Sequence, residues 1–313
     1  MKTLQLECTV IADGLRFPEG PVVLPDGSIA VVEIESGRII RVSLDGKKDM
    51  LAEVGGGPNG AALGPDNYLY ICQNGGFNWV TAADGYLRPH GRADSYMGGG
   101  IQRVDLASGA VEMLYTHCDG NPIMGPNDIV FDGHGGFYFT DHGKTYDRLM
   151  DRGAIFYAAA DGSSIREVVF PCITPNGVGL SPDGKTLYSS ETETGRLWAW
   201  TIEAPGVVAK EPWPSLNGGR FVGGPQGYQR FDSLAVEASG NICVASLIYG
   251  GVSIFTPSGS LLEFYEAPEP YCTNICFGGP DMRTAYITLS GYGRLVAVEW
   301  PRPGLPLACG AER

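Results

Sequence analysis

The chain has little positive charge. Its 22 lysine and arginine residues are outnumbered by 35 aspartate and glutamate residues, which gives a formal net charge of −13. Such a surface repels nucleic acid phosphates and anionic membranes, so we expect neither as a partner. No apolar stretch reaches the roughly 18 residues of a membrane-spanning helix, and the start lacks the apolar run of a signal peptide. We therefore expect a cytoplasmic location.

Histidine and closely paired cysteine, the usual zinc ligands, are also scarce. The four histidines show no metal-ligand spacing. Cys272 and Cys276 lack the second pair or the histidine partner that a zinc site requires. The eight cysteines are scattered along the 313 residues. In a cytoplasmic protein we expect them to be buried free thiols rather than disulfides.

The chain is rich in turn-forming residues, with 46 glycines and 22 prolines, and it contains a repeated pattern. In each repeat a polar residue opens an apolar run, a Pro-Asp-Gly or Gly-Gly type of turn follows, and a second apolar run completes a β-hairpin. These six hairpins span residues 18–33, 58–73, 126–141, 175–191, 231–246 and 273–290. A fold made of six similar hairpins points to a β-propeller.

A second hairpin follows each of the first five repeats, at residues 37–54, 100–116, 153–170, 195–210 and 251–267. Two hairpins make one four-stranded blade, so the sequence predicts an all-β, six-bladed propeller that occupies residues 1–313 as a single domain. The sixth repeat has only one further strand, at residues 293–300, whereas residues 6–14 form a spare strand at the start. We expect this N-terminal strand to complete the last blade and to close the ring.

Two segments fall outside the repeats. Residues 74–100 are an insertion in the second repeat, rich in glycine and aromatic residues, that could form a loop over a pocket. The proline-rich segment after residue 300 is expected to lie on the surface.

The residues that open the six repeats are the candidate site. The first strand of each propeller blade lines the central channel, so its first residues converge at one end of the axis. All six side chains offer oxygen donors: Glu19, Asn59, Asn127, Asn176, Asp232 and Asn274. Such a group suits calcium, magnesium or manganese, and leaves zinc or ferrous iron open. Asparagine and aspartate are also common turn residues, but a turn does not explain Glu19.

Four motifs resemble the SMP-30/gluconolactonase/regucalcin family: FPEGP around Glu19, GPNDIVFD around Asn127, PNGVGLSPDGKTLY around Asn176 and FDSLAVEASGNICVA around Asp232. The resemblance implies a six-bladed propeller in which one divalent metal ion, calcium first among the candidates, is held by Glu19, Asn176 and Asp232. Asn127 would be a fourth ligand or a substrate contact. Members of this family hydrolyse aldonolactones and related lactones, so a small lactone is the expected substrate and Asp232 the expected general base.

The second strand of each blade returns to the same end of the channel and offers further polar side chains. We expect substrate contacts from Asn59, Gln73, Asn127, His142 and Asn274. His142, in the segment FTDHGK, could instead be an ordinary loop histidine. Two other functions remain compatible with the sequence: hydrolysis of organophosphates or other esters at the same metal site, and a non-catalytic metal-binding platform.

Overall fold

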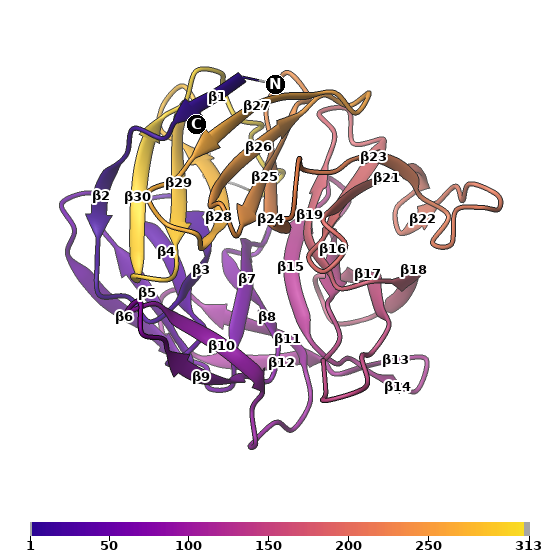
Figure 1. Ribbon diagram of the computed structural model, residues 1–313. Coiled ribbons are helices and arrows are strands. Elements are labelled where there is room, and N and C mark those ends of the chain that lie inside the picture. Colours follow the sequence, from indigo (N-terminus) through magenta and orange to yellow (C-terminus); the bar gives the residue numbers. More distant parts are fainter. Residues whose placement is uncertain (1, 310–313) are drawn as a thin grey trace.

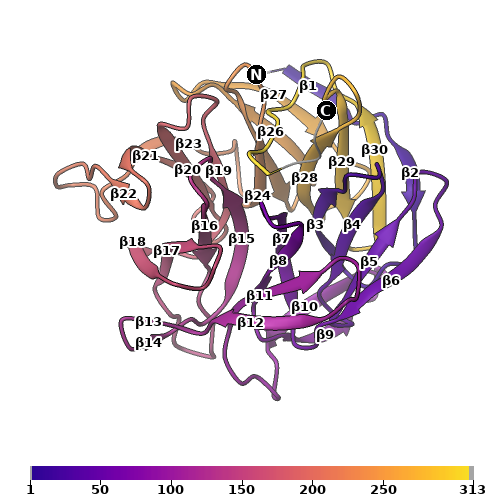
Figure 2. The same ribbon diagram turned by 180° about the vertical axis from the view of Figure 1, so that it is seen from behind.

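The computed structural model describes residues 2–309, and within them every regular element is a β-strand. Six sheets of four or five strands are arranged around a central axis, which confirms the six-bladed propeller, and two further pairs of strands form separate hairpins (Figure 1). The view from behind shows the same closed arrangement (Figure 2). Among residues 2–309 there is no helix long and apolar enough to cross a membrane.

The first three blades each contain four antiparallel strands, which follow one another from the axis outward. Blade 1 consists of β3 (Pro18–Val23), β4 (Ile29–Glu33), β5 (Arg38–Val42) and β6 (Lys48–Glu53). Blade 2 consists of β7 (Pro58–Leu63), β8 (Tyr68–Gln73), β11 (Gly100–Asp105) and β12 (Val111–Tyr115). Blade 3 consists of β15 (Pro126–Phe131), β16 (Gly136–Asp141), β17 (Gly153–Ala159) and β18 (Ile165–Cys172), and is preceded by the short hairpin of β13 (His117–Cys118) and β14 (Asn121–Pro122).

The other three blades follow the same plan with local changes. Blade 4 consists of β19 (Pro175–Leu180), β20 (Thr186–Glu191), β21 (Arg196–Ala204), β22 (Val207–Val208) and β23 (Arg220–Gly223). Blade 5 consists of β24 (Arg230–Val236), β25 (Ile242–Leu247), β26 (Gly251–Phe255), β27 (Leu261–Glu266) and β1 (Lys2–Gln5). Blade 6 consists of β28 (Cys272–Gly278), β29 (Thr284–Leu289), β30 (Arg294–Glu299) and β2 (Thr9–Ala12).

The ring closes as the sequence predicts. Strand β2 pairs antiparallel with β30, with Val10 opposite Val296, and so supplies the missing outer strand of blade 6. Strand β1 was not expected: it adds to blade 5 as a fifth strand, parallel to β27. The N-terminal segment up to residue 12 therefore joins two neighbouring blades.

The outer part of blade 4 differs from the prediction. We expected the strand after the turn at residues 205–206 to be the fourth strand, but β22 is only two residues long. The fourth position is taken by β23, which pairs with the first half of β21, whereas β22 pairs with its second half. Because β21 is nine residues long, it offers two separate stretches of edge.

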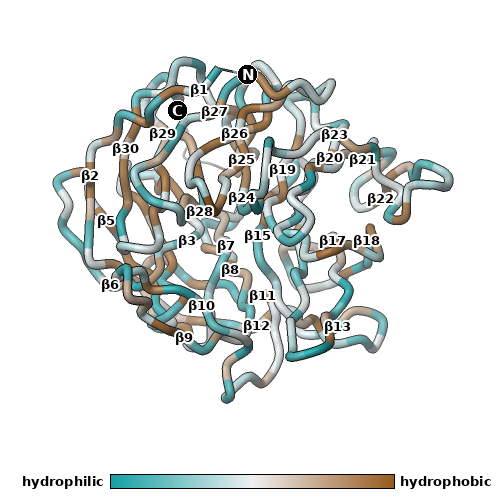
Figure 3. The backbone as a smooth tube through the Cα atoms, viewed as in Figure 1, coloured by the Kyte–Doolittle hydropathy of each residue, from teal (hydrophilic) through white to brown (hydrophobic). Residues whose placement is uncertain are grey.

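The hydrophobic core is divided into six layers, one between each pair of neighbouring blades. Val22 and Ile39 of blade 1, for example, pack with Leu63 and Leu69 of blade 2. The colours of Figure 3 show these apolar segments within the blades and hydrophilic ones in the loops. A strand packed on both faces reads as a nearly continuous apolar run, as in the fully buried β4.

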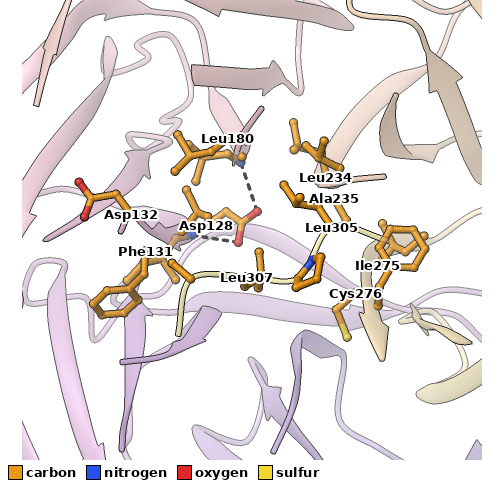
Figure 4. Close-up of a pocket in the computed structure, with 18 of the residues that line it drawn as sticks. Asp128, Phe131, Asp132, Leu180, Leu234, Ala235, Ile275, Cys276, Leu305 and Leu307 are labelled. Atoms are coloured by element: carbon orange, nitrogen blue, oxygen red, sulfur yellow. Dashed lines mark hydrogen bonds between the residues drawn. The ribbon is translucent and has the colours of Figure 1, made fainter. Parts of the chain in front are cut away.

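The segment after β30 lies over the far end of the central channel. The Leu305 N–H donates to the Val236 carbonyl of blade 5 at 2.8 Å, and Cys309 packs against the core layer of blades 2 and 3. Leu305–Ala308 thus form the floor of a cavity of about 260 Å³ that extends up the channel to Asp128 and Asn274 (Figure 4). The segment is a partly exposed strap rather than a free surface tail.

Candidate functional site

The six repeat-opening residues lie at the start of the innermost strands, as predicted. All are buried except Asp232, which is partly buried, and each innermost strand contacts the next around the ring. In every blade the pairing of the first two strands shifts register beside these residues. The residues are therefore in irregular, bulge-like parts of strands rather than in turns, and bulges are known to redirect side chains next to active sites.

Glycines directly after three of these residues allow the inner strands to approach. A Cβ atom on Gly20 would lie 2.5 Å from the carbonyl oxygen of Asn59, and one on Gly60 would lie 2.5 Å from that of Asn127. The equivalent atom on Gly177 would lie 2.5 Å from the Leu234 nitrogen. The Glu-Gly and Asn-Gly pairs of the sequence are thus a packing requirement of the channel.

The end of the channel at which the repeat-opening residues lie, called the mouth below, holds three carboxyl groups. The sequence did not predict one of them. Glu19 accepts hydrogen bonds from the Gly20 N–H at 2.8 Å and from Asn274 Nδ2 at 2.7 Å. Asp128, the missed group, accepts from the Ile129 and Val178 N–H groups at 3.0 and 3.3 Å. Asp232 is the third, and the neighbouring Asn176 side chain favours its ionised form.

Burial is the main cause of the pKa shifts of Glu19, Asp128 and Asp232. It raises the pKa of Glu19 from its ordinary 4.5 to about 7. Burial, together with the charge of Glu19, raises the pKa of Asp128 from 3.8 to about 7 and that of Asp232 well above its ordinary value. No lysine, arginine or histidine within residues 2–309 forms an ion pair with any of the three. When ionised, these carboxylates therefore have no cationic side chain among the described residues to balance their charge.

The amide side chains complete the donor set. The Oδ1 atom of Asn127 is buried without a hydrogen-bond partner. Asn176 donates from Nδ2 to Thr192 Oγ1 at 3.0 Å, which directs its Oδ1 toward Ser233 Oγ at 3.4 Å. Within residues 2–309 no three or more His, Cys, Asp or Glu side chains are grouped as metal ligands, so a cation here would need the amides as well. Carboxylate and amide oxygens with a buried, unpaired acceptor fit a hard divalent ion.

Gln73 lies at this end of the channel, but the protein backbone occupies its amide group. Its Oε1 accepts from the N–H groups of Gly57 and Gly75, and its Nε2 donates to the Gly55 carbonyl at 2.9 Å. The residues that end the second strands of blades 1, 3 and 4 also accept backbone N–H groups of loops: Glu33, Asp141 and Glu191. This geometry favours a bracing role for Gln73 over the predicted substrate contact.

His142 and Asn59 remain available at the mouth. His142 is partly exposed, and desolvation, together with the positive charges of Lys144 and Arg230, lowers its pKa to about 4. The imidazole is therefore neutral at neutral pH and can either donate or accept a hydrogen bond. Asn59 is 6% exposed and lies in the same ring as Asn274 and Asn127.

Comparison with known proteins identifies the family to which the sequence is similar. The family model described as the SMP-30/Gluconolactonase/LRE-like region matches residues 17–291. The chain is 29% identical to Lactonase drp35 of Staphylococcus haemolyticus over 249 residues, which cover 79% of this chain and 68% of the relative. It is 24% identical to a gluconolactonase of Zymomonas mobilis, covering 86% and 75% of the two chains.

Solved structures show the same fold. A gluconolactonase of Xanthomonas campestris superposes with a TM-score of 0.73 at 21% identity and covers 93% of this chain and 89% of its own. Regucalcin of Agrobacterium tumefaciens, a calcium-binding protein, superposes with a TM-score of 0.73 at 18% identity and covers 98% and 100%. With the family model matching nearly the whole propeller, the chain belongs to the SMP-30/gluconolactonase/LRE-like family.

Proposed function

We propose that the protein is a divalent-metal-dependent hydrolase that opens the ring of a small lactone. The observation that carries the proposal is the end of the channel where Glu19, Asp128 and the partly buried Asp232 have no cationic partner within residues 2–309 and the Asn127 Oδ1 atom is unpaired. The names of the relatives, lactonase and gluconolactonase, support the reaction class. The calcium-binding neighbour supports the metal.

Glu19, Asn127, Asn176 and Asp232 would hold the cation. When bound, it would act as a Lewis acid toward the lactone carbonyl. Calcium is our first choice because every donor is an oxygen; the same donors leave zinc, manganese, magnesium and ferrous iron as further candidates.

Asp232 would act as the general base. As water attacks the carbonyl carbon, the Asp232 carboxylate takes its proton; when the ring C–O bond breaks, the same group returns the proton to the leaving alkoxide. Asn59 and the neutral His142 would orient the lactone. The predicted contact from Asn274 is less favoured, because its amide donates to Glu19 and accepts from the Ile275 N–H group.

The test is hydrolysis of a panel of five- and six-membered lactones after chelation, followed by restoration with calcium, zinc, manganese, magnesium or ferrous iron one at a time. We expect no turnover in chelator and recovery with at least one cation. A panel of phosphotriesters and simple esters runs in parallel. Turnover of phosphotriesters alone would identify an organophosphate hydrolase instead. Tight cation binding without turnover of any substrate would identify a metal-binding platform.

A further inference from the structure

The insertion in blade 2 is a hairpin rather than a loose loop. It consists of β9 (Phe77–Thr81) and β10 (Leu87–Arg92), paired antiparallel. It leaves blade 2 at the end of the channel where the carboxyl groups lie, because it follows β8, whose last residue Gln73 is at that end. In Figure 1 it lies over blade 1, in front of β5 and β6.

Both ends of the hairpin are fixed to other blades. At its base, Lys144 of blade 3 lies with Nζ 4.3 Å from the centre of the Phe77 ring and 3.4 Å from the Gly76 carbonyl oxygen. At its tip, the Leu87 N–H donates to the Gly291 carbonyl of blade 6 at 3.1 Å. The hairpin thus contacts blade 3 at its base and blade 6 at its tip.

A row of aromatic rings runs beneath this hairpin toward the candidate site. Phe77 and Trp79 have ring centres 6.2 Å apart, and Trp79 and Phe17 have theirs 5.0 Å apart. Phe17 then meets Tyr271 at 6.2 Å, and Tyr271 meets Tyr86 at 5.7 Å. Phe17 precedes Glu19 by two residues, which connects the row to the strand that begins with Glu19 and its neighbours.

The row keeps ring surface that a ligand could cover. Phe77, Trp79 and Tyr271 are only partly buried, although Phe17 is 6% exposed. The Phe17 backbone adopts a φ of 55°, a conformation that is uncommon for a residue other than glycine. Thr174, two residues before Asn176, has a similar φ of 48°, so this conformation belongs to the entry into an inner strand.

Four of the polar side chains at this end of the channel are occupied by the protein itself. The side chains that end the second strands of blades 1 to 4 all bind backbone N–H groups, as described for Gln73 and its equivalents, and so are not free to bind sugar hydroxyls. A polyhydroxylated lactone needs a hydrogen-bond partner for each hydroxyl that loses water, whereas an apolar group needs only surface to cover.

We propose that this row selects lactones that carry an aromatic or extended apolar substituent, with the substituent packed against Trp79 and Phe77 and the lactone ring directed toward Asp232. The inference rests on the proposed lactonase function and names its substrate class. Pockets of this kind bind through apolar walls and use few polar groups to fix orientation.

The experiment compares kcat/KM for γ-phenyl-γ-butyrolactone, unsubstituted γ-butyrolactone and glucono-δ-lactone in the native protein and in Trp79→Ala. We expect the native protein to favour the phenyl lactone, and Trp79→Ala to lower kcat/KM for it by about tenfold or more while changing the unsubstituted lactone by less than about twofold. Trp213→Ala is the matched control, because Trp213 is 81% exposed on blade 4; it should change neither.

Trp79→Phe keeps an aromatic ring and should keep most of the preference for the phenyl lactone. This variant provides a second test in case Trp79→Ala does not fold. The inference is overturned if the native protein favours glucono-δ-lactone, or if Trp79→Ala slows the phenyl and unsubstituted lactones equally. Lack of turnover of all lactones would instead count against the proposed function. In that case calorimetric binding of the phenyl lactone to the native protein and to Trp79→Ala decides the inference, and equal or absent binding overturns it.

Discussion

At the scale of single residues, Asp232 combines two tasks that can be separated. It supplies one of the negative charges that attract a cation, and it is placed to take a proton from water. Asp232→Asn keeps the size and an oxygen donor but removes the base. We therefore expect kcat for lactone hydrolysis to fall by about 10²- to 10⁴-fold, with the loss in kcat rather than in KM.

Cation binding to the same variant is measured separately by calorimetry. Binding at a reduced affinity together with lost turnover supports the role as a base. Full turnover with the cation still bound would show that another group takes the proton. Asp49→Asn, on the exposed outer strand of blade 1, serves as the control and should leave kcat unchanged.

The sequence identified most of the polar side chains of the site because they recur at one phase of a repeat. It missed Asp128, which has no counterpart in the other repeats, where the same position is occupied by glycine, serine or isoleucine. Strict strand alternation places neighbours on opposite faces. The register shift between Pro126 and Ile129 breaks this rule and lets Asn127 and Asp128 contribute to one site. The use of the Gln73 amide by loop backbone could not be foreseen either, since it depends on the path of a neighbouring loop.

At the scale of elements, the N-terminal strands allow a direct test of ring closure. Strand β2 covers the edge of β30, whereas β1 adds a mostly exposed strand outside blade 5. Deleting residues 2–5 removes only β1, and we expect the melting temperature to fall by a few degrees at most. Deleting residues 2–12 also removes β2 and Leu6, exposes the edge of blade 6 and opens the ring, so we expect a far larger fall or aggregation.

Differential scanning calorimetry on both variants provides the comparison. Equal melting temperatures for the two deletions would show that β2 does not close the ring. The role of β2 could be predicted because blade 6 visibly lacked a strand and a spare one stood at the other end of the chain. The position of β23 could not be predicted from the sequence. Val207–Val208 follows the turn directly and has a better strand pattern than Arg220–Gly223, which forms the fourth strand instead.

At the scale of the whole molecule, the carboxyl groups of the channel should make stability depend on pH and on cations together. The folded pKa values of Glu19 and Asp128, about 7, lie above their ordinary values of 4.5 and 3.8. Between these values the folded state binds more protons than the unfolded state. Without a cation, these two carboxyl groups should therefore lower the free energy of unfolding as pH rises from about 4 to about 7. His142, whose pKa is lowered to about 4, opposes them with a smaller contribution because it is one group against two.

A divalent cation should reverse this trend, because it binds the folded state and competes with the protons for the same oxygens. We expect the melting temperature in chelator to fall between pH 5 and pH 8, and the increase caused by added calcium to grow over the same range. Glu19→Gln removes one titrating group, so its melting temperature in chelator should vary less with pH, and calcium should raise it less at pH 8. An increase on adding calcium that is the same at pH 5 and pH 8 would mean that the cation binds away from these carboxyl groups.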